Sequence, residues 1–366
     1  MTRTTVAVIY GGRSSEHAIS CISAASVLEH LDRDKYDVVP VGITESGVWV
    51  RGTEDLKRLR LVGGQLPTVD GSREPAVLSL DPSQPGIWFR PDSGPARLQQ
   101  VDVVFPVLHG PNGEDGSIQG LFELAGLPFV GSGVFASAAC MDKGFTKTVL
   151  AAGGLDVGRW NTLHRDEWKA DPAAAIAASA GLGWPLFVKP ARAGSSMGVV
   201  KVHDRESLAA AIDHALGHDP RLVLEASVEN AREIECGVLQ RADGSVSASV
   251  PAEIRVREGH EFYDFEAKYL DDSVDLLVPA PIHPSLQTTI QDLAIRAFRG
   301  IACEGLARVD FFITPDDRIV INEINTMPGF TPISMYPRMW QETGVGYAKL
   351  LDVLLEQALA RGSGLR

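Results

Sequence analysis

The chain opens with two continuous apolar runs, at residues 6–10 and 38–43, separated by a segment with helical spacing at 11–31. A continuous apolar run is typical of a strand buried on both faces of a parallel sheet. Parallel neighbours need a long crossover connection, which the intervening helix supplies. The pattern therefore predicts an N-terminal βαβ unit. It also predicts another buried strand at 101–108 and a short one at 129–131.

Residues 45–98 break this pattern because Gly, Pro, Asp and Ser are frequent there and the apolar pieces are short. Short strands are predicted at 48–50 and 87–89. We interpret the segment as an elaborated connection and not as a separate domain. The first domain is predicted to cover residues 1–139.

The middle of the chain alternates short helices and strands and predicts a second domain, residues 140–228. Helices are predicted at 142–152, 173–179 and 207–216, and strands at 185–189, 199–202 and 222–225. The first two of these strands flank a Gly- and Ser-rich loop. We expect them to pair across that loop, because such residues favour a tight connection.

The remaining residues, 229–366, predict a third domain that begins with β-rich sequence near residue 232. A helix at 287–302 precedes a predicted hairpin with strands at 311–313 and 318–322, and an amphipathic helix at 347–360 closes the chain. The turn of the hairpin is Thr314-Pro315-Asp316-Asp317, a composition typical of turns. The fold class is therefore α/β, with an α+β pattern in the second and third domains.

Composition narrows the class of protein. A length of 366 residues allows two or three domains, and 45% hydrophobic with 22% charged residues is ordinary for a soluble globular protein. The net charge of −13 and the lack of a basic run argue against a nucleic-acid partner. No signal peptide and no apolar run of membrane-spanning length is evident, so a cytoplasmic location without membrane contact is predicted.

The four cysteines are Cys21, Cys140, Cys236 and Cys303, and no two of them form a C-x-x-C pair. Scattered cysteines of this kind fit reduced thiols better than a disulfide framework or a zinc site.

Three oxygen-bearing side chains cluster on the predicted hairpin: Asp310, Glu323 and Asn325. Side chains alternate along a strand, so Glu323 and Asn325 share one face. Two carboxylates and an amide oxygen suit Mg²⁺, which completes its shell with water and phosphate oxygens. An isolated motif of this kind is more often two solvated carboxylates beside a turn. The accompanying motifs favour the metal site.

The loop that begins at Lys189 and continues as Pro-Ala-Arg-Ala-Gly-Ser-Ser-Met-Gly can close over phosphate oxygens with its backbone N–H groups. It is not a Walker A loop, because a strand and not a helix follows it. A flexible hairpin tip explains the loop equally well. Lys143, in the first turn of a predicted helix, can reach a phosphate or remain a solvated charge. Glu225 and Glu233 offer only a weak signal for purine and ribose contacts, since solvated edge residues look the same.

In the first domain, residues 11–17 lack the G-x-G-x-x-G spacing of a dinucleotide site. Glu16 can hold a substrate ammonium group or simply complement the helix dipole. His109 follows a buried strand, where open α/β sheets place ligands, although a histidine there is often structural. The segment 262–269 alternates aromatic and charged residues, so it is either an edge strand or a source of Tyr269 for the site.

Taken together, these motifs resemble those of the D-alanine–D-alanine ligases, members of the ATP-grasp superfamily. The matching segments occur in the family's order and span residues 5–355: GGRSSEHAIS, HGPNGEDG, MDK, KPARAGSSMG, EAKY, RVDFF and NEINTMPGFTPISMYP. The resemblance implies a three-domain ATP-grasp architecture with an N-terminal parallel-sheet βαβ domain. It also implies ATP-dependent ligation of two D-alanine molecules through an acyl phosphate, for peptidoglycan precursor synthesis, in a homodimer.

The resemblance further implies a role for each matching residue. Contacts to ATP would come from Lys143, Lys189, Ser196, Glu225, Ala226, Val228, Glu233 and Lys268. Two Mg²⁺ ions, replaceable by Mn²⁺, would be held by Asp310, Glu323 and Asn325. The two substrates would be held by Glu16, His109, Arg308, Gly329, Ser334 and Met335. Catalytic groups would be Glu16, Ser195, Tyr269, Arg308 and Gly329, with Arg308 and the Gly329 N–H meeting the oxyanion.

Three alternatives are open at this point. A relative that joins D-alanine to D-lactate or D-serine would share most motifs, although Tyr269 favours an amine acceptor. A nucleotide-binding sensor without turnover is disfavoured by the intact lysines, carboxylates and Arg308. A nicotinamide-dependent oxidoreductase would rest on the βαβ unit alone, which lacks the dinucleotide spacing.

Overall fold

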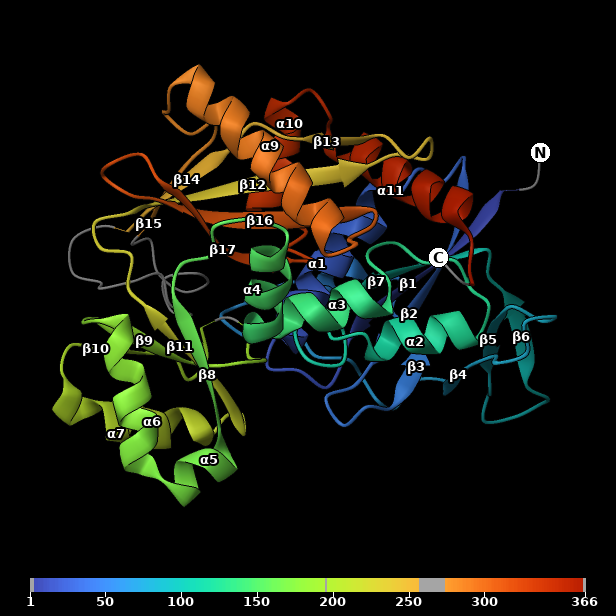
Figure 1. Cartoon of the computed structure of the whole chain (residues 1–366). Helices are drawn as coiled ribbons and strands as arrows, with labels where there is room; N and C mark the ends of the chain where they lie inside the picture. The colour runs from blue at the N-terminus through green and yellow to red at the C-terminus, as the bar shows by residue number, and fades with distance from the viewer. Residues whose placement is uncertain (1–2, 195, 257–273, 365–366) are drawn as a thin grey trace.

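The computed structural model describes residues 3–194, 196–256 and 274–364. Its N-terminal sheet has the strand order β3-β2-β1-β7 (Figure 1). The parallel strands are β2 (Tyr36–Ile43), β1 (Thr4–Gly11) and β7 (Val103–Val107), and α1 (His17–His30) is the crossover. The predicted βαβ unit is confirmed. Its edge strand β3 (Trp49–Arg51) is antiparallel to β2.

The inserted segment forms a small antiparallel sheet of β4 (Ala76–Leu78), β5 (Gly86–Phe89) and β6 (Arg97–Gln100), after a short 3₁₀ helix η1 (Leu56–Leu59). Its apolar side chains share a core with β1, as Ile87 and Phe89 pack in the same cluster as Ala7 and Ile9. A shared core explains why this segment does not need to fold alone, in line with its interpretation as an elaborated connection.

One predicted strand was wrong. Residues 129–131 form no strand, and Phe129 makes only a single parallel bridge with Val104. The apolar signal there has another cause, since Phe129 is buried and its ring packs on Phe122. Before residue 142, two α-helices were not predicted, α2 (Ser117–Leu124) and α3 (Val134–Met141).

The middle lobe has a second sheet, with strand order β10-β9-β11-β8 and every pairing antiparallel. Its core, which contains Val188, Leu208 and Ile212, is separate from the others. Strand β8 was missed because its sequence is mostly polar and only Leu163 is buried. The elements in chain order are α4 (Lys143–Ala152), β8 (Trp160–His164), α5 (Arg165–Ala170), α6 (Pro172–Ser179), η2 (Ala180–Leu182), β9 (Leu186–Pro190), β10 (Val200–Val202), α7 (Arg205–Leu216) and β11 (Arg221–Ala226).

The third sheet is antiparallel, with strand order β15-β14-β12-β16-β17 and β13 paired to β12. Helix α9 begins at Pro284, three residues before the predicted start, with Pro at the first helical position where its missing N–H costs nothing. Strands and helices of this part are β12 (Arg232–Gln240), β13 (Val246–Ala248), β14 (Ala252–Val256), β15 (Val274–Leu277), α9 (Pro284–Gly300), β16 (Leu306–Ile313), β17 (Ile319–Asn325), α10 (Met335–Glu342) and α11 (Tyr347–Arg361).

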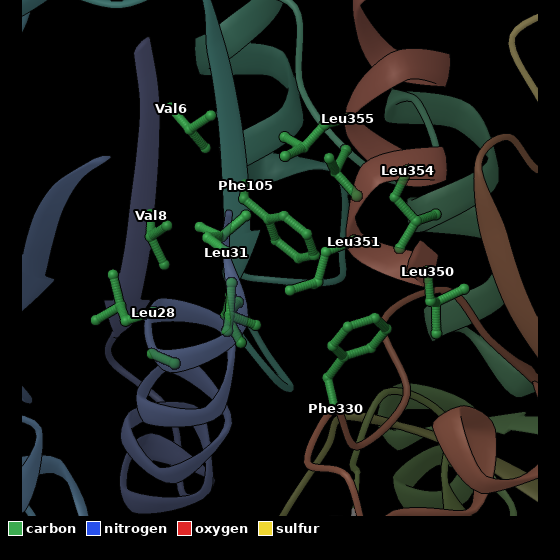
Figure 2. Packing of buried hydrophobic residues seen from close by; sticks show 14 of the residues in the cluster. Val6, Val8, Leu28, Leu31, Phe105, Phe330, Leu350, Leu351, Leu354 and Leu355 are labelled. Carbon is green, nitrogen blue, oxygen red and sulfur yellow. The ribbon is translucent and has the colours of Figure 1, made fainter. Parts of the chain in front are cut away.

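The first and last parts of the chain share one hydrophobic core (Figure 2). Val8 and Phe105 of the N-terminal sheet belong to the same cluster as Leu350 and Leu354 of α11. Phe330 belongs to this cluster and joins its two parts, with ring centroids 5.7 Å from both Phe105 and Tyr347. This core fixes the first sheet against the third, so the loops at their facing ends have a defined relative position. The three predicted domain limits stay a prediction.

All four cysteines are free thiols, as predicted, and all four are buried. Cys140 Sγ and Cys303 Sγ lie 3.9 Å apart, and this contact together with burial raises the pKa of Cys140 well above its ordinary value. Within the described residues, no helix is long and apolar enough to cross a membrane.

We predict that Phe330→Ala lowers the free energy of unfolding by about 3–5 kcal/mol, because it leaves a cavity where the core joins two parts of the chain. Chemical denaturation followed by tryptophan fluorescence would measure the loss. Ile333→Ala is the matched control, since Ile333 lies in the same loop but is 80% exposed. Its effect should stay within about 0.5 kcal/mol. Equal losses of stability in the two variants would contradict the contribution of Phe330 to the shared hydrophobic core.

Candidate active site

The predicted hairpin brings its three oxygen-bearing residues together. Strands β16 and β17 pair so that Asp310 is directly opposite Glu323 and Arg308 is opposite Asn325. The Asn325 side-chain amide donates to Asp310 Oδ2 over 3.0 Å. The register shifts between Asp310 and Phe311, a bulge of the kind that re-aims side chains next to functional sites.

Arg308 lies beside this group and contacts two carboxylates. Its Nε and Nη2 donate to Asp310 Oδ1 and Oδ2, both over 2.7 Å, and Nε is 3.2 Å from Glu235 Oε1. Glu235 is on β12, directly opposite Asp310. Burial alone would lower the pKa of Arg308, but these carboxylates raise it well above its ordinary value. The guanidinium is therefore a permanent, oriented positive charge.

The donor set of the hairpin fits a hard divalent cation. Two carboxylates and an amide oxygen are the ligand types that Mg²⁺ takes, in small number, together with water and phosphate. The side chains of Asp310 and Glu323 are 13% and 27% exposed, so neither carboxylate is fully buried. Within the described residues, no three His, Cys, Asp or Glu side chains are grouped so that they could hold a metal ion. The hairpin group falls outside that criterion because its third candidate ligand is the amide of Asn325.

Lys143 joins the hairpin to the Gly- and Ser-rich loop. Asp142 caps α4 by accepting from the N–H groups of Gly144 and Phe145, which places Lys143 in the first helical turn. Lys143 Nζ donates to the carbonyl of Ala193 over 2.8 Å and lies 3.9 Å from Glu323 Oε2. One ammonium group thus lies between the loop and the acidic pair.

A buried chain of charges runs behind this position. Glu225 on β11 is 3% exposed and receives Lys147 Nζ at 2.6 Å and Lys189 Nζ at 2.7 Å. Lys147 also donates to the Val157 carbonyl over 2.8 Å. Burial alone would raise the pKa of Glu225, but the two lysines hold it at about 2. Glu225 is therefore a fixed anion that orients Lys189 at the start of the loop.

The other residues predicted for ATP lie where the middle lobe passes into the third sheet. Ala226 ends β11, Val228 follows it, and Glu233 is on β12 opposite Phe312. Ser196 lies in the loop with a φ of 58°. Lys268 lies outside the described residues. These positions line the junction of two sheets, and the individual contacts to ATP stay predictions.

Three segments meet at Glu16, which is 7% exposed. It occupies the N-cap position of α1, yet its carboxylate makes no capping bond to the helix. A methyl group at Gly110 would approach Glu16 Oε2 to 2.6 Å, and one at Gly194 to 2.7 Å. Gly194, in the Gly- and Ser-rich loop, therefore lies against the first domain. Ser195 and Tyr269, predicted to complete this network, lie outside the described residues.

His109 is held at both ring nitrogens. Nδ1 is 3.0 Å from the carbonyl of Met327, and Nε2 is 3.0 Å from Ser23 Oγ. Burial lowers the pKa of His109 below its ordinary value, so the neutral ring is favoured. The two hydrogen bonds link His109 to Met327 and Ser23 and show no contact with a substrate. The predicted contact of His109 with the first substrate therefore stays a prediction.

Glu114 was missed by sequence reasoning, although it belongs to the same motif as His109. Its Oε2 accepts from the Gly110 N–H over 2.5 Å and its Oε1 from the Met327 N–H over 3.2 Å. Burial and the nearby negative charge of Glu16 raise the pKa of Glu114 to about 8.

The predicted second-substrate residues lie beside the hairpin. A methyl group at Gly329 would come within 3.3 Å of Ser334 Oγ. Ser334 is the N-cap of α10, where unsatisfied N–H groups favour a carboxylate. Met335 is the first residue of that helix and packs against Ala252 and Met339. This arrangement suits the predicted roles, which stay predictions.

Two further residues carry buried charges. Lys147 had no predicted role, and Glu235 was only a weak candidate for a ribose contact, beside Glu233. Lys147 is four residues after Lys143 and therefore on the same face of α4, which is the signal that identifies it. Glu235 alternates with Glu233 on a strand, which puts both on one face of the sheet. The sequence spacing shows which residues share a face of the helix or strand. It does not show which residue forms the ion pair with each buried charge.

Comparisons with known proteins agree with this arrangement. Residues 5–132 match the family model for the N-terminus of D-ala D-ala ligase, and residues 149–356 match the model for its C-terminus. D-alanine--D-alanine ligases of Streptomyces griseus and Nocardia farcinica are each 53% identical to the chain. Those matches cover 99% and 100% of this chain and 94% and 99% of the relatives.

Two solved structures have the same fold. The VanG D-Ala:D-Ser ligase from Enterococcus faecalis has a TM-score of 0.85 at 37% identity, covering 98% of this chain and 100% of that one. The D-alanine-D-alanine ligase from Coxiella burnetii has a TM-score of 0.82 at 35% identity, covering 99% and 95%. The fold is that of an ATP-grasp enzyme of the ligase class. Within that class, the chain belongs to the D-alanine–D-alanine ligase family.

We predict that Lys147→Met lowers the free energy of unfolding by about 3–5 kcal/mol, because it leaves Glu225 buried with one partner fewer. The pKa of Glu225 is depressed, so its ion pairs with the lysines stabilise the folded protein fully above the ordinary pKa of 4.5. That stabilisation is lost as the pH falls toward about 2. The gap between wild type and variant should therefore narrow over that range in urea denaturation.

The matched control is Lys349→Met, whose side chain is 61% exposed and 3.9 Å from Glu356. Its effect should be within about 0.5 kcal/mol, as expected for a surface pair. A Lys147→Met protein as stable as this control would show that the buried charge chain contributes little.

Proposed function

We propose that the chain joins two molecules of D-alanine to D-alanyl-D-alanine, converting ATP to ADP and phosphate. The observation that carries this proposal is the position of Lys143. Its ammonium group contacts the Ala193 carbonyl and faces Glu323, while the neighbouring Gly194 lies against Glu16. A phosphate-binding loop, an acidic pair and a candidate ammonium-binding carboxylate are thereby close enough to serve one reaction.

ATP would bind at the junction of the second and third sheets. Lys143 and Lys189 would contact its phosphates, with the backbone of the 191–198 loop closing over them as an anion-binding nest. The segment from Glu225 to Glu233 would hold adenine and ribose. The anion of Glu225 keeps Lys189 charged, since its carboxylate raises the pKa of that lysine despite burial.

Asp310, Glu323 and Asn325 would hold two Mg²⁺ ions, with Mn²⁺ able to substitute. Bound Mg²⁺ would neutralise part of the charge that develops on the transferring phosphoryl group. The chain's own share is positioning, because phosphoryl transfer needs the nucleophile and the phosphate in line and leaves little covalent chemistry to the protein.

The first D-alanine would bind with its ammonium group at Glu16 and its carboxylate toward the phosphates. A carboxylate oxygen attacks the γ-phosphorus of ATP, the bond to the bridging oxygen breaks, and ADP and an acyl phosphate result. Acyl phosphates hydrolyse readily, so the 191–198 loop would exclude water by lying over Glu16.

The second D-alanine would bind with its carboxylate at Ser334 and the Met335 N–H. Its neutral amine attacks the acyl carbon and a tetrahedral oxyanion forms. The nitrogen then loses a proton and the bond to phosphate breaks, so that hydrogen phosphate leaves with that proton and the dipeptide remains. Arg308 and the Gly329 N–H would stabilise that oxyanion. The loss of one such donor typically costs about 2.7–4 kcal/mol of transition-state stabilisation.

The product would be the dipeptide used in peptidoglycan precursors, which fits a cytoplasmic location. The proposal also includes a homodimer formed through the first domain, as the family resemblance suggests. Ligation to D-serine is the second candidate, because one of the matching solved structures is a D-Ala:D-Ser ligase. The more similar curated relatives are D-alanine--D-alanine ligases, which favours D-alanine as the acceptor.

We predict ATP-dependent phosphate release with D-alanine alone, and slower release when D-serine or D-lactate is the only added acceptor. The rate with D-alanine should rise with pH, because only the neutral amine attacks, whereas a hydroxyl acceptor gains nothing from amine deprotonation. Dipeptide and depsipeptide products would be separated and quantified. A preference for D-serine or D-lactate would replace the proposed acceptor, and nucleotide binding without D-alanine-dependent release would indicate a sensor.

We predict that Glu323→Gln removes turnover while preserving the fold. The substitution keeps the side-chain volume but removes the charge of a metal ligand. The loss of turnover should exceed about 100-fold. Removal of a residue that only hydrogen-bonds to a metal ligand costs up to about 100-fold, and removal of the ligand's own charge should cost more. Asp316→Asn, in the exposed turn of the same hairpin, is the control and should be fully active. Near-normal turnover of Glu323→Gln with Mg²⁺ would refute the metal assignment.

A further inference from the structure

The backbone of Met327 is held on both sides by one loop of the first domain. The Met327 N–H donates to Glu114 Oε1 over 3.2 Å, and the Met327 carbonyl is 3.0 Å from His109 Nδ1. Met327 follows the hairpin strand β17 and precedes Gly329 by two residues. A segment of the third part of the chain is therefore clipped to the first.

The donors and acceptors of this clip follow from its chemistry. A carbonyl oxygen only accepts, so Nδ1 of His109 carries the proton, and Nε2 of the neutral ring accepts from the Ser23 hydroxyl. One carboxyl oxygen of Glu114 accepts from the Met327 N–H and the other from the Gly110 N–H. Glu114 therefore ties the loop backbone to the Met327 backbone through a single side chain.

The opposite side of the same loop touches the first-substrate position. Gly110 has a φ of 74°, and a Cβ atom at that position would lie 2.6 Å from Glu16 Oε2, so any side chain there would displace the carboxylate. The Gly110 carbonyl accepts from the Gly113 and Glu114 N–H groups, which keep the loop closed. The loop is thus a short rigid spacer between Glu16 and Met327.

We propose that Glu114 and His109 are positioning residues for the second half of the reaction. They hold Met327, and through it the Gly329 N–H, at a set distance from the substrate bound at Glu16. This inference rests on the proposed function. A misplacement of about 1 Å can cost about 100-fold in rate, so release of the clip would slow amine attack on the acyl phosphate.

The proposal predicts that the two chemical steps separate. Phosphoryl transfer depends on Glu16, the lysines and the hairpin, whereas the clip acts on the segment that leads to Gly329. Attack by the second amine depends on the Gly329 donor. A protein with a released clip should form the acyl phosphate and then fail to use it.

The test is Glu114→Gln against Asp115→Asn. Both substitutions replace one carboxyl group of the same loop by an amide, but Asp115 accepts from the N–H groups of Asn112 and Ser117, within the loop and its following helix. Rapid-quench turnover would record ADP and dipeptide separately, and hydroxylamine would trap the acyl phosphate as a hydroxamate.

For Glu114→Gln we expect a 10- to 100-fold slower formation of dipeptide (roughly the range for a displaced oxyanion donor), an ADP burst, and trapped hydroxamate. The dissociation constant of ATP, measured without D-alanine, should stay within about twofold, because the clip acts on the segment that leads to Gly329 and not on the lysines that would contact the nucleotide. Asp115→Asn should match the wild type. Parallel loss of ADP and dipeptide, or an unaltered Glu114→Gln protein, would overturn the proposal.

A double-mutant cycle gives a second measurement. His109→Leu loses the donor to the Met327 carbonyl, so its effect and that of Glu114→Gln should be less than multiplicative, because both act through one residue. Multiplicative losses would contradict the clip.

Hydrogen exchange separates this inference from the proposed function and does not require activity. In Glu114→Ala, the amides of residues 326–330 should exchange faster, while those of β16 and β17 keep their protection. If the wild type makes no dipeptide, the proposed function is wrong. Hydrogen exchange then still tests whether Glu114 holds the Met327 segment. Unaltered exchange at 326–330 would exclude it.

Discussion

The segment from Met327 to Phe330 is the point on which the structure depends, because the hydrophobic core and the polar site meet there. Phe330 is fully buried between the N-terminal sheet and α11, and its carbonyl accepts from the Tyr347 hydroxyl over 2.6 Å. Three residues earlier, Met327 is bonded to His109 and Glu114. Apolar packing thereby sets the position of a loop whose polar groups belong to the site.

Electrostatics impose a second constraint, since the site collects many charges in a protected place. Each cation is set against a carboxylate: Lys189 and Lys147 against Glu225, and Arg308 against Asp310. A buried charge without a partner is costly, so these pairs are a condition of folding as well as of function. They also leave the cations oriented in advance, so little reorganisation is needed when a phosphate or an oxyanion arrives.

Local sequence signals predicted much of the fold because they describe short-range physics. The apolar runs at 6–10 and 38–43 became the parallel strands β1 and β2, and Asp142 capped α4 at the predicted start. Signals failed where tertiary contacts decide. Polar β8 is a strand because β11 offers it a partner, and apolar Phe129 is core without being a strand.

The sequence by itself determined the chemistry that is available: which residues carry oxygen, ammonium and guanidinium groups, and that Asp310, Glu323 and Asn325 share a hairpin. Alternation along strands is a local property, so residue spacing alone was enough to predict that group. The partners of these groups could not be predicted in this way. The contacts of Glu114 and His109 with Met327 span more than 200 positions of the chain. Only the shared core, which brings the two sheets together, decides that such distant residues meet.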